Sequence, residues 1–261
     1  MSNQPIGVFD SGIGGTSILR EVVKLLPNEK FIYIADSANA PYGEKSPEEI
    51  LALSKKNVEF LLEKDCKLII VACNTATTNA IKQLRAEYPI SFIGIEPAIK
   101  PAALHSKTNT IGILATKGTL SSKLFSEKVD LLTGKTKVIE VVGKGLVEHI
   151  ESGDLQSEKL LNLLKEYVEP MLDNKIDYLV LGCSHYPYLI PILKKIVPKE
   201  VKIIDSGEAV ARQTKFILEK EGILNGHLRK EGIIFYTSGK KYILEIICKK
   251  YFTNFIVKVY N

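Results

Sequence analysis

Short runs of apolar residues alternate with longer stretches in which apolar and polar positions follow a helical period. The apolar runs at the start of the chain predict four strands, over residues 6–9, 31–35, 68–72 and 90–95. The stretches between them predict three helices, over residues 17–26, 46–64 and 75–88. Because continuous apolar strands separated by helices are typical of a parallel sheet covered on both faces, this part of the chain predicts an α/β unit.

The same pattern then begins again. Residues 111–116 match residues 6–11 at an offset of 105, and a strand over 178–182 that ends in Cys183 matches the strand that ends in Cys73 at an offset of 110. A strand over 138–142 falls between them, as the second strand does in the first half. Any α/β protein repeats strands at some spacing, but the matching cysteines favour an internal duplication.

A strand over residues 201–204 completes the second half, and Pro97 and residues 205–207 are the expected crossings between the halves. The tail predicts a helix over 208–221, a strand over 233–236, a helix over 240–251 and a strand over 255–259. Terminal segments left over after a complete second domain often return to the first. We therefore predict a first domain of residues 1–96 with 207–261, and a second domain of residues 97–206.

Composition and charge narrow the function classes. The 261 residues are 45% hydrophobic and 25% charged, which is typical of a globular protein rather than a disordered one. The net charge is +5 and the lysine pairs are dispersed, so we expect no nucleic-acid partner. No apolar run reaches the roughly 18 residues of a membrane span. The N-terminus lacks the pattern of a signal peptide, which predicts a cytoplasmic protein with four reduced cysteines.

Ligands of open parallel sheets bind beyond the carboxyl ends of the strands, so the residues that follow each strand are the candidates for chemistry. A helix expected after the second strand of the second half, and expected to be long, adds Glu148, His149 and Glu151. The candidates at the strand ends themselves are Asp10, Ser11, Asp36, Tyr42, Gly43, Cys73, Asn74, Thr75, Cys183, Ser184 and His185.

The glycine-rich turn at residues 12–15 is similar to a dinucleotide fingerprint, but Ser17 stands at its third glycine position. The carboxylate of Asp10 would also face a pyrophosphate. The turn is therefore either a tight connection between strand and helix or a small-anion or amino-acid site built from backbone N–H groups. We favour the anion or amino-acid site.

Cys73 and Cys183 each end a strand and precede a helix, where the helix N-terminus is expected to lower the pKa of a thiol. Cys66 and Cys248 fit buried core positions instead. No CxxC pair is present, and Cys183 with His185 and one remote cysteine would supply three zinc ligands at most, so we expect no metal. If the two halves face each other, one thiolate can remove a proton from a carbon while the opposite thiol protonates its other face.

Four motifs carry a resemblance to glutamate racemases of the aspartate/glutamate racemase superfamily. They are residues 9–15 (FDSGIGG), Asp36 followed by Pro41-Tyr42-Gly43, residues 71–76 (VACNTA) and residues 182–187 (GCSHYP). The resemblance implies two pseudo-symmetric flavodoxin-like α/β domains with parallel sheets and the active site between them. It also implies racemisation of L- and D-glutamate without a cofactor and supply of D-glutamate for peptidoglycan. We further expect a homodimer.

The resemblance also implies roles for individual residues. Cys73 and Cys183 resemble the two catalytic bases, Asp10 and His185 the polar groups that assist each thiol, and Asp36 and Glu151 supporting groups. The implied substrate contacts are Asp10, Ser11, Tyr42, Gly43, Asn74, Thr75, Ser184 and His185.

Some positions depart from the family pattern. Ser184 stands where Thr is usual, Tyr188 replaces a Leu, and Ala35 and Asn39 replace Gly and Arg. None of these changes removes an acid or a base, so they bear on kinetics rather than on the class of reaction. The alternatives are a racemase for aspartate or a related acid, and a non-enzymatic protein that binds an amino acid or a nucleotide.

Overall fold

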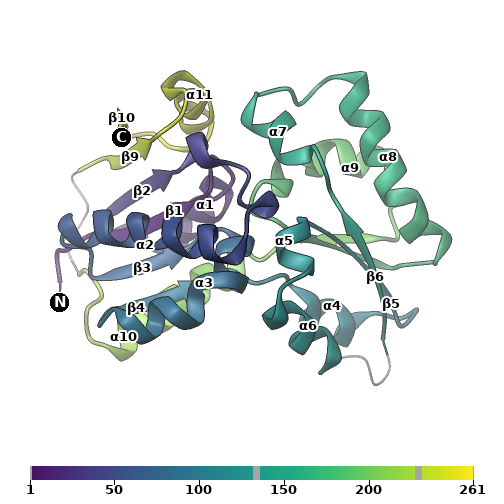
Figure 1. Cartoon of the computed structure of the whole chain (residues 1–261), viewed down its shortest axis with the longest axis horizontal. Coiled ribbons are helices and arrows are strands. Elements are labelled where there is room, and N and C mark those ends of the chain that lie inside the picture. The colour runs from purple at the N-terminus through teal and green to yellow at the C-terminus, as the bar shows by residue number, and fades with distance from the viewer. Residues whose placement is uncertain (1, 132–135, 227–230, 261) are drawn as a thin grey trace.

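Two parallel sheets lie side by side in two lobes, as Figure 1 shows for the computed structural model, which describes residues 2–131, 136–226 and 231–260. The first sheet has the order β10-β9-β2-β1-β3-β4. Its strands are β1 (Ile6–Asp10), β2 (Phe31–Ala35), β3 (Leu68–Val71), β4 (Ser91–Gly94), β9 (Ile233–Thr237) and β10 (Phe255–Val259). The second sheet has the order β6-β5-β7-β8 and is built from β5 (Thr110–Ala115), β6 (Lys137–Val142), β7 (Tyr178–Gly182) and β8 (Lys202–Ile204).

The strand orders confirm the predicted α/β fold with two related halves. In each half the first strand lies between the second and the third, because β1 pairs with β2 and β3, and β5 pairs with β6 and β7. The chain therefore reverses its direction across the sheet at β1 and again at β5, which are the switch points where parallel sheets bind ligands.

The tail extends the first sheet only. Strand β9 pairs with β2, and β10 pairs with β9, so the yellow end of the chain in Figure 1 returns to the lobe that holds the N-terminus. Helix α10 (Gly207–Lys220) packs against α1 (Thr16–Leu25) of the same lobe. The domain bounds themselves, residues 1–96 with 207–261 and residues 97–206, stay a prediction.

Helices cover both faces of each sheet. In the first lobe, α1, α10 and α11 (Lys241–Tyr251) pack on one face, while α2 (Pro47–Glu63) and α3 (Asn74–Glu87) pack on the other. Helix α2 begins as the sequence predicts, with Ser46 and Glu49 forming a capping box. In the second lobe the two groups are α4 (Ile99–His105), α5 (Lys117–Leu120) and α6 (Lys123–Asp130), and α7 (Leu146–Glu151), α8 (Glu158–Asp173) and α9 (Ile190–Ile196). None of the described helices is long and apolar enough to cross a bilayer.

The expectation of one long helix carrying Glu148, His149 and Glu151 is wrong. Helix α7 ends at Glu151, and Gly153 follows with a φ of 79°, a left-handed conformation that glycine adopts without strain. A new helix, α8, then begins beyond the cap residue Ser157. The break leaves Glu151 at the end of a short helix.

Candidate active site

The carboxyl ends of β1, β3 and β7 meet between the two lobes. Asp10 ends β1, Cys73 follows β3 by two residues, and Cys183 follows β7 directly. The Ser184 hydroxyl, from the second lobe, donates to Asp10 Oδ1 over 3.0 Å. Cys73 and Cys183 are 4% and 6% exposed, so both thiols are enclosed. The structure thus brings the residues from the two duplicated strand ends into one buried polar cluster.

The glycine turn holds the carboxylates of the protein itself. The N–H groups of Gly12 and Gly15 donate to Asp10 Oδ2 over 3.3 and 2.9 Å, and the Ile13 N–H donates to Glu151 Oε1 over 2.7 Å. Two side-chain carboxylates thus occupy these three N–H groups, which are not available to the small anion or amino acid expected at this turn. The turn orients Asp10 and binds the second lobe.

Close approach of the second lobe explains two of the glycines in the turn. A Cβ on Gly14 would lie 2.3 Å from His185 Nδ1, and one on Gly12 would lie 1.9 Å from Glu151 Oε1. A side chain at Gly14 would displace the buried imidazole of His185, and one at Gly12 would displace the carboxylate of Glu151. The glycine pattern in the sequence thus serves contact between lobes rather than a nucleotide.

Cys73 caps helix α3, as its place in the sequence suggests. The Ala76 N–H donates to its Sγ over 3.4 Å, and the Sγ lies 3.7 Å from Ser11 Oγ. Burial raises the pKa of Cys73 well above the usual value for a thiol, and the charge of Asp10 raises it further. The expectation of a lowered pKa is therefore wrong at this site, because burial and a neighbouring anion outweigh the N–H groups of the helix.

Cys183 lies beside an imidazole that is held from its far side. His185 Nδ1 is 3.8 Å from Cys183 Sγ and 4.0 Å from Asp10 Oδ2, and His185 Nε2 is 2.6 Å from Glu151 Oε1. Burial acts to lower the pKa of His185, but the hydrogen bonds to Cys183 and Glu151 and the charges of Asp10 and Glu151 raise it well above its usual value. The imidazolium is the favoured form. Burial raises the pKa of Asp10, against the opposing effect of His185.

Asp36 supports a loop of the first lobe and lies apart from the thiols. Its carboxylate accepts hydrogen bonds from the Tyr42 hydroxyl at 2.6 Å, from Asn39 Nδ2 at 2.9 Å and from the Ser238 hydroxyl at 3.0 Å. The Tyr42 hydroxyl is therefore used within the first lobe. The same loop brings Gly43 against the second lobe, where its Cβ would lie 2.7 Å from that of Thr116.

Asn74 is the candidate with the clearest capacity for a ligand. Its side chain is 2% exposed, and neither its Oδ1 nor its Nδ2 has a hydrogen-bond partner in the described part of the chain. Buried polar groups are nearly always paired in native proteins, so an unpaired buried amide next to Cys73 in the chain points to a polar ligand.

Thr75 takes part in a contact that the sequence did not single out. Its hydroxyl lies 2.8 Å from that of Thr116 and 3.3 Å from that of Thr119, both in the second lobe. The sequence could have indicated Thr116 as a candidate, because it occupies the position of Ser11 in the duplicated pattern. Two candidates do not join the cluster: His149 pairs with Asp154 over 2.9 Å, and Glu148 is exposed on α7.

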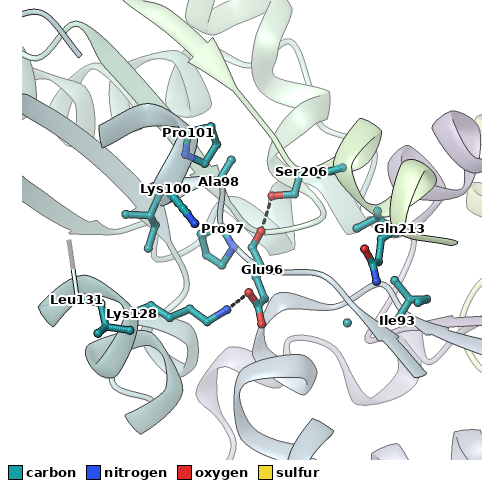
Figure 2. Close-up of a pocket in the computed structure, with 14 residues that line it drawn as sticks. Ile93, Glu96, Pro97, Ala98, Lys100, Pro101, Lys128, Leu131, Ser206 and Gln213 are labelled. Carbon is teal, nitrogen blue, oxygen red and sulfur yellow. Dashed lines mark hydrogen bonds and ion pairs between the residues drawn. The ribbon is translucent and has the colours of Figure 1, made fainter. Parts of the chain in front are cut away.

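A cavity of about 610 Å³ lies where the chain crosses between the lobes (Figure 2). The Glu96 carboxylate pairs with Lys128 there, and the Ser206 hydroxyl donates to the Glu96 carbonyl. The two crossings expected near Pro97 and residues 205–207 are thus tied to each other. Neither thiol lines this cavity.

Comparisons with known proteins agree with one another. Residues 6–214 match the family model for Asp/Glu/hydantoin racemases. The chain is 45% identical to the glutamate racemase of Herpetosiphon aurantiacus over 239 residues, which cover 92% of this chain and 94% of that protein. A glutamate racemase isoform from Bacillus anthracis has a similar structure, with a TM-score of 0.90 and 32% identity over 100% of this chain and 98% of that one. The Escherichia coli glutamate racemase, in complex with L-glutamate and an activator, has a TM-score of 0.87 and 31% identity over 98% of each chain.

Proposed function

The chain belongs to the Asp/Glu/hydantoin racemase family, and from this premise we infer that it is a glutamate racemase, an isomerase that interconverts L- and D-glutamate. One observation carries the mechanism. Cys73 and Cys183, both buried, reach one polar cluster from the carboxyl ends of two different sheets. Two thiols on opposite sides of a substrate are what inversion at a carbon by proton transfer requires.

We propose that one thiolate removes the α-proton while the opposite thiol delivers a proton to the other face of the carbon. By the family resemblance, Cys183 acts as the base on L-glutamate and Cys73 as the base on D-glutamate. Each turnover moves one proton onto the first sulfur and takes one from the second. The pair must exchange these protons before the next turnover in the same direction.

His185 and Asp10 are proposed to assist the two thiols. The imidazolium of His185 can donate from Nδ1 toward a thiolate at Cys183, while Glu151 holds Nε2. The carboxylate of Asp10 is held from both lobes: Ser184 of the second lobe donates to its Oδ1, and the glycine turn of the first lobe donates to its Oδ2. Asp36 supports the loop that faces Thr116.

The substrate is proposed to bind in the polar cluster. The unpaired amide of Asn74 can both donate to a carboxylate and accept from an ammonium group, which matches the two charged groups on the α-carbon. The main chain of the loop at Tyr42 and Gly43 completes the site, because the Tyr42 hydroxyl is already bound to Asp36. The remaining proposed contacts are Asp10, Ser11, Thr75, Ser184 and His185.

Exchange of the α-proton with solvent tests the proposal. The purified protein, treated with a chelator and given no cofactor, is incubated with L-glutamate in D₂O. We expect D-glutamate to form with deuterium at the α-carbon, measured by NMR and by chiral chromatography. Loss of activity on chelation that metal restores would overturn the proposed cofactor independence.

The same assay separates the two alternatives. Aspartate or a related acid that exchanges faster than glutamate would identify a racemase of different specificity. A protein that only binds an amino acid would produce no exchange at all. We expect exchange with glutamate at least tenfold faster than with aspartate, a ratio that amounts to about 1.4 kcal/mol.

We also propose that the protein works in the cytoplasm as a homodimer and supplies D-glutamate for peptidoglycan. All four cysteines are unpaired, which suits a reducing compartment. Exposed apolar side chains of Ile246 on α11 and of Ile256 and Val259 on β10 support a contact with a second copy. Analytical ultracentrifugation tests the dimer, and a single species with the mass of one chain would contradict it.

A further inference from the structure

Tyr188 of the second lobe reaches across to the start of helix α1 in the first lobe. It lies in the short helix η3 (Tyr186–Leu189), and its hydroxyl is hydrogen-bonded to the hydroxyl of Thr16. Thr16 is fully buried and donates its single proton to the Ile13 carbonyl over 2.6 Å. Because that proton is committed, the Tyr188 hydroxyl must be the donor to Thr16.

The second lobe therefore holds residue 13 from two sides. The Ile13 N–H is bound to Glu151 over 2.7 Å, and the Ile13 carbonyl is bound through Thr16 to Tyr188. Tyr188 is also tied to the thiol site within its own lobe, because its N–H donates to the His185 carbonyl over 3.1 Å. One chain of hydrogen bonds thus joins the turn that orients Asp10 to the segment that carries His185.

The ring of Tyr188 is held in place by the C-terminal tail. It packs against Tyr251 of α11 with ring centroids 6.1 Å apart and an interplanar angle of 53°. The Arg20 guanidinium lies 5.1 Å from the centroid of the Tyr251 ring. Burial raises the pKa of Tyr188 above its usual value, which keeps the hydroxyl protonated and able to donate. A leucine at this position could fill the space but could not make the hydrogen bond.

We propose that Tyr188 is a positioning residue that latches the second lobe onto the glycine turn through Thr16 and keeps the two thiols enclosed. The latch acts on the reaction through Asp10 and His185 without touching the substrate. Its kinetic consequence rests on the proposed racemase function, whereas its effect on closure of the site does not.

Labelling of the cysteines tests closure without any assay of activity. Wild type, Tyr188→Phe and Thr16→Val are treated with iodoacetamide in the absence of substrate, and each cysteine is quantified by peptide mass spectrometry. We expect Cys73 and Cys183 to be labelled about fivefold faster in both variants, the ratio that corresponds to loss of one hydrogen bond. Cys66, buried in the core of the first lobe, reports unfolding and should be labelled at the wild-type rate.

Thr16→Ser is the matched control, because it keeps the hydroxyl and should label like wild type. Since the Thr16 pair of variants is independent of Tyr188, the comparison stands even if Tyr188→Phe folds poorly. Equal labelling of Cys73 and Cys183 in Thr16→Val and Thr16→Ser would overturn the latch. Acceleration of Cys66 to the same degree would also overturn it, by showing general destabilisation instead.

Kinetics then test positioning. Tyr188→Phe and Thr16→Val should each lower kcat/KM for both enantiomers by about fivefold or more, and the double variant should be no worse than Thr16→Val, which already lacks the hydrogen bond to Tyr188. Multiplied effects in the double variant would overturn the proposal. If wild type fails to racemise glutamate, the proposed function is wrong, but the labelling result still decides whether the latch exists.

Discussion

Cys73 and Cys183 occupy corresponding ends of β3 and β7, yet their surroundings differ. Around Cys73 the Ala76 N–H and the Ser11 hydroxyl are close to the sulfur, and the nearby charge is the carboxylate of Asp10. Around Cys183 the neighbour is His185, whose raised pKa favours an imidazolium. The two thiols therefore lie at corresponding strand ends but have different neighbours.

The difference shows that duplication of the backbone does not require equal chemistry on the two sides. At Cys73, burial and an anion keep the proton on sulfur, so this thiol is suited to deliver a proton. At Cys183, a thiolate can form a charge-assisted hydrogen bond to an imidazolium that Glu151 holds in place. The two sulfur atoms therefore lie in different electrostatic surroundings.

Replacing each of the two proposed catalytic thiols in turn is expected to have the largest effect on racemisation. Serine is nearly isosteric with cysteine but a far weaker acid, so Cys73→Ser and Cys183→Ser should each lower racemisation by about 10³-fold or more without unfolding the protein. Elimination from a β-substituted glutamate analogue needs only one base. Cys73→Ser should therefore still process the L-form and Cys183→Ser the D-form, as measured by release of the leaving group.

Each mutant is the control for the other, because both are assayed with both enantiomers of the analogue and should differ only in which one they process. Retention of the same enantiomer by both mutants would mean that the two thiols do not act from opposite faces. Near wild-type racemisation by Cys73→Ser would lead to the same conclusion.

Displacing His185 of the second lobe should lower proton removal by Cys183 more than proton removal by Cys73. In Gly14→Ala the new Cβ would lie 2.3 Å from His185 Nδ1, so the imidazole must move. A displacement of about 1 Å can cost about 100-fold in rate, and we expect a loss of this size in kcat. Elimination from the L-form of the analogue should fall further than elimination from the D-form.

Gly222→Ala is the control for this substitution. Gly222, which follows helix α10, has a positive φ and no atom within 4 Å of an added Cβ, so alanine there strains the backbone by about 1–2 kcal/mol without a contact to the site. Equal losses of activity in the Gly222 and Gly14 variants would attribute the effect to general destabilisation.

Removing the charge of Glu151 should have a smaller effect that depends on pH. Glu151→Gln keeps the shape of the side chain and loses an anion that raises the pKa of His185, so the imidazolium should deprotonate at a lower pH. We expect kcat/KM for L-glutamate to fall about 10- to 100-fold, in line with loss of a charged hydrogen bond. The alkaline limb of its pH profile should move to lower pH. An unmoved limb would show that His185 does not assist Cys183 as an imidazolium.

The two remaining cysteines should have the smallest effect. Cys66 packs beneath Gly7, with its Sγ 3.1 Å from where a Cβ on that glycine would lie, and Cys248 is fully buried on α11. Replacing either with alanine should leave kcat within about twofold and cost about 1 kcal/mol of unfolding free energy, measured by urea denaturation. A collapse of activity in folded Cys66→Ala would show that the bases are wrongly assigned.

The strands and helices followed from local pattern. Apolar runs and cap residues such as Ser46 act within a few residues, so the order of elements and the duplication could be predicted from the sequence, including the matched positions of Cys73 and Cys183. It also placed the candidate side chains at strand ends, because all strands of a parallel sheet present their carboxyl ends at one edge.

The hydrogen-bond partners and the burial of those side chains depend on the tertiary structure. The N–H groups of the glycine turn are occupied by Asp10 and Glu151, and burial reverses the expected pKa shift of Cys73. The link from Tyr188 to Thr16 joins residues 172 positions apart. Sequence pattern reports the neighbours along the chain, whereas burial, charge and hydrogen bonding at this site depend on the approach of two lobes.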